Sequence, residues 1–184
     1  MSPTGFRRTG ARTEYEGRRY SMRVVSVEAP SGESFEREFL VHPGAVVVIP
    51  LHDDDTITLV RQYRAAVDDE LLELPAGIRD VDDEPLERTA ARELTEETGL
   101  VAERFELVSR LHNSAGCTDE EDWIFLATGL SDGVGDFQGV EEQHMSTERL
   151  GLAEVRCLVA DGLITDATTI IGVLLAVERR GAGG

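Results

Sequence analysis

The chain has 184 residues, of which 36 are acidic and 18 basic, so its formal net charge at neutral pH is −18. This length favours a self-sufficient unit whose core is large enough to need no disulfide or metal staples. The negative charge repels nucleic-acid backbones and anionic membranes, so neither is expected as a partner. Every basic residue is arginine, which excludes lysine Schiff-base and P-loop chemistry.

The cysteines and the apolar segments indicate a reducing, aqueous compartment. Cys117 and Cys157 lie far apart and form neither a CxxC pair nor a disulfide framework. The arginine-rich N-terminal residues contain no signal peptide, and the apolar run at 170–177 is far shorter than the ~20 residues that cross a bilayer. We therefore expect a cytoplasmic protein without a membrane segment.

The N-terminal part of the chain is predicted to form strands. After a mobile start, residues 22–30 and 35–41 alternate apolar and polar side chains around a short turn, which predicts a small antiparallel sheet over about residues 18–41. Two segments rich in β-branched residues, 45–51 and 56–64, then flank an acidic tip and predict a hairpin that begins the main sheet.

The remaining elements alternate between strand and helix patterns. Their order predicts an α/β sandwich around a mixed sheet, with no internal repeat and no interdomain linker. The expected elements are a short strand at 71–77, a helix from Pro85 to about Thr98, strands at 103–112 and 122–130, a long loop at 131–143, and helices at 152–162 and 166–181.

The helix at 85–98 has well-marked ends and an acidic face. Pro85 suits the first helical position and Gly99 suits a left-handed stop. Leu86, Ala90 and Leu94 define its buried stripe at ~100° per residue.

Three carboxylates lie beside this stripe rather than opposite it. Glu93 and Glu97 fall at its edge and Glu96 a little further round. Solvated glutamates are one interpretation, but carboxylates beside apolar surface are costly unless a cation neutralises them. Hard oxygen ligands at this spacing suit Mg²⁺ or Mn²⁺. Arg92 can reach Glu96 at i+4, either to orient a ligating carboxylate or as an ordinary surface ion pair.

The segment from Gly77 through Glu84 to RELTEETGL resembles the signature of Nudix hydrolases. Glu84 stands eight residues before Arg92, as the signature asks, and Arg92–Leu100 matches it throughout. One departure is that six residues, not five, separate Gly77 from Glu84. The insertion falls in the turn before the helix, so we expect it to lengthen the loop without moving the metal-binding register.

The similarity extends over most of the chain, to the ADP-ribose pyrophosphatase branch of the family. It implies a Nudix α/β/α sandwich around a mixed sheet at residues 42–184, with a small N-terminal antiparallel β-domain at residues 1–41 that serves dimerisation. The resemblance therefore implies a homodimer whose active sites draw on both chains.

The resemblance also implies roles for the residues of the signature. Glu93 and Glu97 become the principal Mg²⁺ (or Mn²⁺) ligands. Glu96 is a further carboxylate of the cluster, and the Ala76 carbonyl a backbone ligand. Glu84 and Arg92 become orienting groups of the catalytic machinery.

The resemblance also implies roles for residues outside the signature. Arg64 corresponds to a phosphate-contacting arginine, unless it is only an exposed arginine at a strand end. Glu73 is assigned to the sugar or adenine side of the substrate, across the subunit interface. Of the loop residues Glu141 and Glu142, one is expected to activate water or complete the metal site, with Glu141 favoured over a merely solvated pair.

A second departure concerns the substrate. In the stretch NSAGCTDEE, Ala115 precedes Gly116 where ADP-ribose-preferring members have proline, and without that ring φ is less restricted, so the loop can shift against the terminal ribose. The implied reaction is metal-dependent hydrolysis of a nucleoside diphosphate linked to another group, with ADP-ribose giving AMP and ribose 5-phosphate. The alternatives are another nucleotide sugar, a dinucleotide or a nucleoside triphosphate, and a catalytically silent nucleotide sensor.

Overall fold

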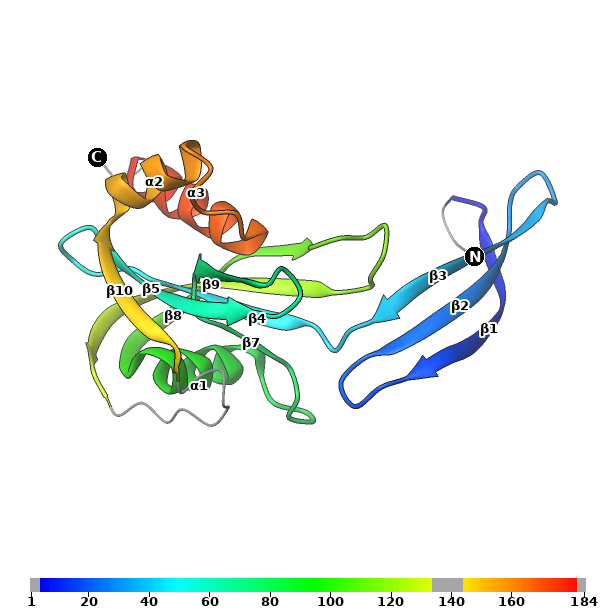
Figure 1. The fold of residues 1–184 in the computed structure, drawn as a ribbon, viewed down its shortest axis with the longest axis horizontal. Helices are drawn as coiled ribbons and strands as arrows, with labels where there is room; N and C mark the ends of the chain where they lie inside the picture. The colour runs from blue at the N-terminus through cyan, green and yellow to red at the C-terminus, as the bar shows by residue number, and fades with distance from the viewer. Residues whose placement is uncertain (1–3, 134–143, 182–184) are drawn as a thin grey trace. The chain divides into compact units, whose positions relative to one another are not determined.

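The computed structural model describes residues 4–133 and 144–181, and Figure 1 shows it as a ribbon. It divides into two units. The N-terminal unit runs to Gly44 and includes the distant segment His112–Glu121. The second unit consists of Ala45–Leu111 and the chain from Asp122 onward.

The N-terminal unit is built on an antiparallel sheet in the order β1-β2-β3. Segment His112–Glu121 is attached to the end of β3, where the Leu40 N–H donates to the Cys117 carbonyl at 2.8 Å and the Asp119 N–H to the Leu40 carbonyl at 3.2 Å. A turn of distant sequence thus belongs to this unit. The three strands are β1 (Arg7–Glu16), β2 (Ser21–Glu28) and β3 (Ser34–Val41).

Strand β1 corrects the sequence prediction, which placed a mobile start before residue 18. β1 pairs with β2 along its length, with register shifts between Arg8 and Gly10 and between Thr13 and Tyr15. All ten of its residues are exposed, and their sequence carries no apolar alternation to mark a strand. The strand is defined by backbone pairing, which composition does not reveal.

The second unit contains two sheets among its described residues. The four-stranded sheet has the order β7-β4-β9-β8, with β4 parallel to β9 and antiparallel to β7. The three-stranded sheet has the order β10-β5-β6 and is antiparallel. The strands are β4 (Ala45–Pro50), β5 (Thr56–Arg64), β6 (Asp69–Glu73), β7 (Ala76–Ile78), β8 (Leu100–His112), β9 (Glu121–Asp132) and β10 (Ser146–Gly151).

The structure corrects two strand predictions, one in its pairing and one in its extent. β4 and β5 do not form the expected hairpin ladder, because they lie in different sheets; the segment between them has one isolated antiparallel bridge, from Leu51 to Ile57. β4 instead pairs with β7 and β9 along its two edges. The expected strand at 71–77 is divided at Pro75, which has no N–H, into β6 and β7 of different sheets.

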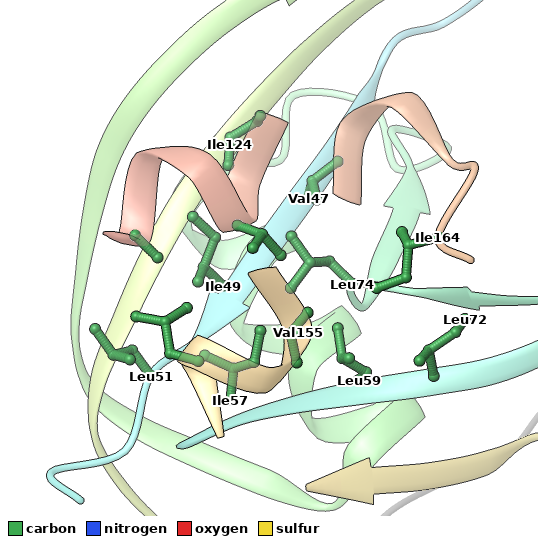
Figure 2. Packing of buried hydrophobic residues seen from close by; sticks show 13 residues of the cluster. Val47, Ile49, Leu51, Ile57, Leu59, Leu72, Leu74, Ile124, Val155 and Ile164 are labelled. Carbon is green, nitrogen blue, oxygen red and sulfur yellow. The ribbon is translucent and has the colours of Figure 1, made fainter. Parts of the chain in front are cut away.

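Helices cover both faces of the four-stranded sheet, which confirms the predicted α/β/α sandwich (Figure 1). Val46 and Val48 on one face of β4 pack with the α1 residues Ala90 and Leu94. The opposite face packs against α2 and α3 in a larger cluster (Figure 2). The helices are α1 (Leu86–Thr98), α2 (Leu152–Ala160) and α3 (Ala167–Gly181), and the larger cluster includes Val47, Ile49, Ile57, Leu59, Leu74, Ile124, Val155, Ile164 and Val173.

The start of α3 is tied to the segment between β6 and β7. The Asp166 carboxylate accepts the Thr169 N–H at 2.7 Å and so caps the helix, as predicted. The hydroxyl of the buried Thr169 in turn accepts the Leu74 N–H at 2.8 Å. These bonds fix the backbone directly after Glu73. None of the helices in the described residues is long and apolar enough to span a membrane.

Candidate active site

Helix α1 carries two buried carboxylates beside its apolar stripe, as the sequence predicted. Pro85 is the extended residue just before the helix rather than its first residue, and Gly99 ends the helix in the left-handed conformation with φ 69°. The exposed fraction is 8% for Glu93 and 7% for Glu97. The helix therefore carries negative charge on the side that meets the sheet.

Both of these carboxylates contact strand β7. The Ala76 N–H donates to Oε2 of Glu97 at 3.0 Å. The Glu93 carboxylate lies directly against Gly77, in the space that a Cβ at this position would occupy. The glycine of the motif therefore has a physical role, which the sequence argument did not give it: any side chain here displaces Glu93.

Arg92 binds four carboxylates around α1. Its Nη1 lies 2.8 Å from Oε1 of Glu93 and 3.0 Å from Oε2 of Glu96, which is the predicted i,i+4 contact. Its Nη2 lies 3.4 Å from both Glu84 and Asp80. Burial alone would lower the pKa of Arg92, but the neighbouring carboxylates raise it, so the guanidinium stays charged.

Thr89 is a residue of this cluster that sequence reasoning missed. Its side chain is on the buried face of α1, 1% exposed, and its hydroxyl donates to Oε2 of Glu84 at 2.9 Å. The sequence signal that could have identified it is its position directly before Ala90 of the apolar stripe. The extra residue of the motif is accommodated before the helix, where Asp83 has φ 59°, and Glu84 still reaches Arg92.

Burial and the neighbouring carboxylates disfavour the charged form of Glu93. Burial raises the pKa of Glu93 to about 7; Arg92 acts in the opposite direction, and Glu96 and Asp80 add to the rise. A carboxylate in such surroundings gains stability from any positive charge placed near it. This is the electrostatic condition that favours binding of a metal ion.

The oxygen donors around α1 fit a hard divalent cation in their chemistry. Glu93 and Glu96 are bridged by one nitrogen of Arg92, and Glu97 is bonded to the backbone of Ala76. In residues 4–133 and 144–181, no three His, Cys, Asp or Glu side chains are arranged to hold an ion as they stand. Arg92 occupies the position between two of the donors.

Arg64 and Glu73 are brought together at the ends of β5 and β6. Glu73 is 3% exposed, and its carboxylate accepts from Nε of Arg64 at 3.0 Å and from Nη2 at 2.6 Å. The Gln62 amide also donates to Glu73, at 2.9 Å. Burial would lower the pKa of Arg64, but the bonds and charge of Glu73, together with the charges of Glu97 and Asp166, raise it.

The remaining predicted residues lie either in the N-terminal unit or outside the described residues. Ala115 and Gly116 are exposed and belong to the N-terminal unit, in a turn where the Cys117 N–H donates to the Ser114 carbonyl at 2.9 Å. Glu141 and Glu142 lie outside the described residues. After these residues comes β10, whose Ser146 pairs with Arg61 of β5.

The NUDIX domain model matches residues 41–164, and the chain belongs to the Nudix hydrolase family. It is 36% identical over 174 residues to the ADP-ribose pyrophosphatase of Mycobacterium tuberculosis, covering 95% of this chain and 84% of that protein. It is 34% identical to the methanol dehydrogenase activator of Bacillus methanolicus and 33% identical to the ADP-ribose pyrophosphatase of Bacillus subtilis, each over 159 residues, 86% of this chain and 85% of the relative.

The fold is also similar to a solved structure, a crystal structure of an ADP compounds hydrolase. The TM-score is 0.85, with 97% of this chain and 96% of that chain covered at 22% identity. The likeness supports the fold assignment.

Replacing Gly77 tests whether the close approach of Glu93 to β7 matters for activity. In Gly77→Ala the new methyl group must displace the Glu93 carboxylate, so we expect kcat to fall by roughly 10–100-fold, the range for groups that orient metal ligands. Gly181→Ala is the matched control, because a Cβ there meets nothing within 4 Å. Equal turnover of both variants, measured with saturating divalent metal, would contradict the role assigned to Gly77.

Proposed function

We propose that this Nudix enzyme hydrolyses the pyrophosphate bond of ADP-ribose to give AMP and ribose 5-phosphate. The observation that carries the proposal is the set of buried carboxylates held between α1 and β7, at the positions that the signature reserves for catalysis. The Mycobacterium tuberculosis and Bacillus subtilis relatives named ADP-ribose pyrophosphatase support the substrate. Ala115, in place of the usual proline, favours another nucleoside diphosphate sugar as the second candidate.

In this proposal, Glu93, Glu96, Glu97 and the Ala76 carbonyl hold Mg²⁺ or Mn²⁺. When bound, the cation supplies charge neutralisation for the pyrophosphate and lowers the pKa of water. The net charge of −18 makes this neutralisation necessary, since the acidic surface otherwise repels the substrate.

The positively charged and orienting side chains of the chain have distinct tasks in this mechanism. Arg92 holds Glu93 and Glu96 in place, and Glu84, fixed by Thr89, holds Arg92 from the other side. Arg64 contacts a phosphoryl group of the substrate. We assign the transfer of the proton from the attacking water to Glu141, or to its neighbour Glu142.

A panel of nucleoside diphosphate compounds tests the function. With Mg²⁺ or Mn²⁺, ADP-ribose is expected to give the highest kcat/KM, scored by phosphate release after coupling to a phosphatase. No hydrolysis of any compound would contradict the enzyme assignment and favour a nucleotide sensor. A higher kcat/KM for another compound would change the assigned substrate but not the assigned reaction, pyrophosphate hydrolysis.

Glu97→Gln separates catalysis from folding. The amide keeps an acceptor for the Ala76 N–H but removes a buried charge, so kcat should fall by more than about 10²-fold. In metal-free buffer the melting temperature should hold or rise, because repulsion among the carboxylates of α1 is relieved. Turnover near that of the wild type at saturating Mg²⁺ would mean that Glu97 holds no metal.

The loop glutamates are distinguished by substituting them one at a time. Glu141→Gln should lower kcat by roughly 10²–10⁴-fold with little change in KM, as expected for a positioned acid–base group, and Glu142→Gln should be mild. The reverse ranking would move the assignment by one residue. If neither variant loses even tenfold, water activation belongs to the carboxylates of α1, with Glu96 as the first candidate.

We also propose that the protein is a homodimer through its N-terminal strands and works in the cytoplasm. Strand β1 presents an exposed, unpaired edge in the described chain, and Cys117 and Cys157 are both free thiols, which suits a reducing compartment. Light scattering should give about 40 kDa, twice the chain mass of 20.2 kDa. A mass near that of a single chain would contradict the dimer.

A further inference from the structure

Glu73 is a charged residue in surroundings that exclude solvent. It is 3% exposed, and both carboxylate oxygens accept hydrogen bonds from the adjacent strand of its own chain. Oε1 is bonded to Nε of Arg64, and Oε2 accepts from Nη2 of Arg64 and from the Gln62 amide. A carboxylate bound on both oxygens and shielded from solvent has little capacity left to contact a sugar or a base.

Arg64 is different, because it is accessible. Its side chain is 46% exposed, although two of its three nitrogens are engaged by Glu73. The third, Nη1, makes no hydrogen bond to a residue of the described ranges. The charges of Glu97 and Asp166, together with Glu73, raise the pKa of the guanidinium.

The backbone beneath this pair is fixed. Val60 and Glu73 are opposite each other in the β5–β6 ladder, and Gln62 and Arg64 follow on the same side of β5. The next residue after Glu73 is bonded through its N–H to Thr169 of α3. Glu73 therefore stands on a rigid part of the fold, whereas the arginine stem is long and flexible.

We propose that Glu73 is a positioning residue, which fixes the Nε and Nη2 edge of Arg64 so that Nη1 is presented to a phosphoryl group of the substrate. This inference rests on the proposed function, in which Arg64 contacts phosphate. It replaces the expectation that Glu73 itself reaches the sugar or adenine. An arginine fixed before binding loses less conformational freedom when the phosphate arrives, so the gain appears in substrate affinity.

A purely structural ion pair is the competing explanation. Buried ion pairs are weak evidence for stability, because desolvation offsets their attraction, whereas removing one partner alone is strongly destabilising. Stability measurements by themselves therefore do not distinguish the two roles. Coupling between the two residues in substrate binding does.

The test is a double-mutant cycle of Glu73→Gln, Arg64→Ala and the double variant. For each we would measure kcat and KM for ADP-ribose, the Kd for AMP and the melting temperature. Glu73→Gln should weaken kcat/KM by roughly 10–100-fold, mainly through KM, and the double variant should be no worse than Arg64→Ala alone. Glu70→Gln, the same change at an exposed site on β6, is the matched control and should leave all four quantities unchanged.

Three outcomes would overturn the proposal. If the two losses multiply in the double variant, Glu73 acts on the substrate independently of Arg64. If Arg64→Ala keeps the wild-type kcat/KM, there is no phosphate contact to position. If only the melting temperature falls, the pair is structural.

A second variant and a second substrate cover the cases in which the first choice fails. Should Glu73→Gln fail to fold, Glu73→Asp retains the charge but withdraws the carboxylate by one methylene, and its loss must likewise vanish in the Arg64→Ala background. Should the wild type prefer another compound of the panel, the proposed substrate fails but the cycle, run with that compound, has the same outcomes.

Discussion

The candidate site depends on the placement of two carboxylates, Glu93 and Glu97, where helix α1 meets strand β7. Each is less than one-tenth exposed, so the field of each charge is poorly screened by water. Keeping these buried carboxylates ionised costs free energy unless cations lie close to them. Arg92 supplies one, 2.8 Å from Glu93, and its charge lowers the pKa of that carboxyl while burial raises it.

The same constraint organises the residues around the helix. Gly77 leaves room for a carboxylate, Thr89 fixes Glu84, and Glu84 holds Arg92 against the other acids. These contacts connect the turn before α1 to the middle of the helix. Rigid placement of this kind matters in a metal-assisted hydrolase, because small displacements of oriented groups reduce activity strongly.

The Arg64–Glu73 pair is connected to the carboxylate cluster of α1 through the short segment that joins β6 to β7. The break at Pro75 sends β6 and β7 into different sheets, so that Glu73 faces β5 while Ala76 and Gly77 face α1. Thr169 of α3 holds the backbone at this break. A short stretch of chain thereby supports both the proposed phosphate-binding arginine and the proposed metal ligands, from opposite sides of one proline.

The sequence by itself determined helix α1, its ends and its acidic face, because these depend on local periodicity and on capping residues within one turn. It also determined the sandwich and the family, through the order of elements and the spacing of the signature. The contacts of Arg92 with Glu96 and of Asp166 with α3 are local as well, and both are present.

Only the tertiary structure decided which strands are partners and which polar groups meet. β1 has no apolar alternation, and its strand exists through pairing with β2. The separation of β4 from β5, and the attachment of His112–Glu121 to β3, depend on backbone hydrogen bonds between distant segments. From the sequence, Glu73 was predicted to be a carboxylate that contacts the substrate. Its burial against Arg64 arises from cross-strand register, which no short window of sequence contains.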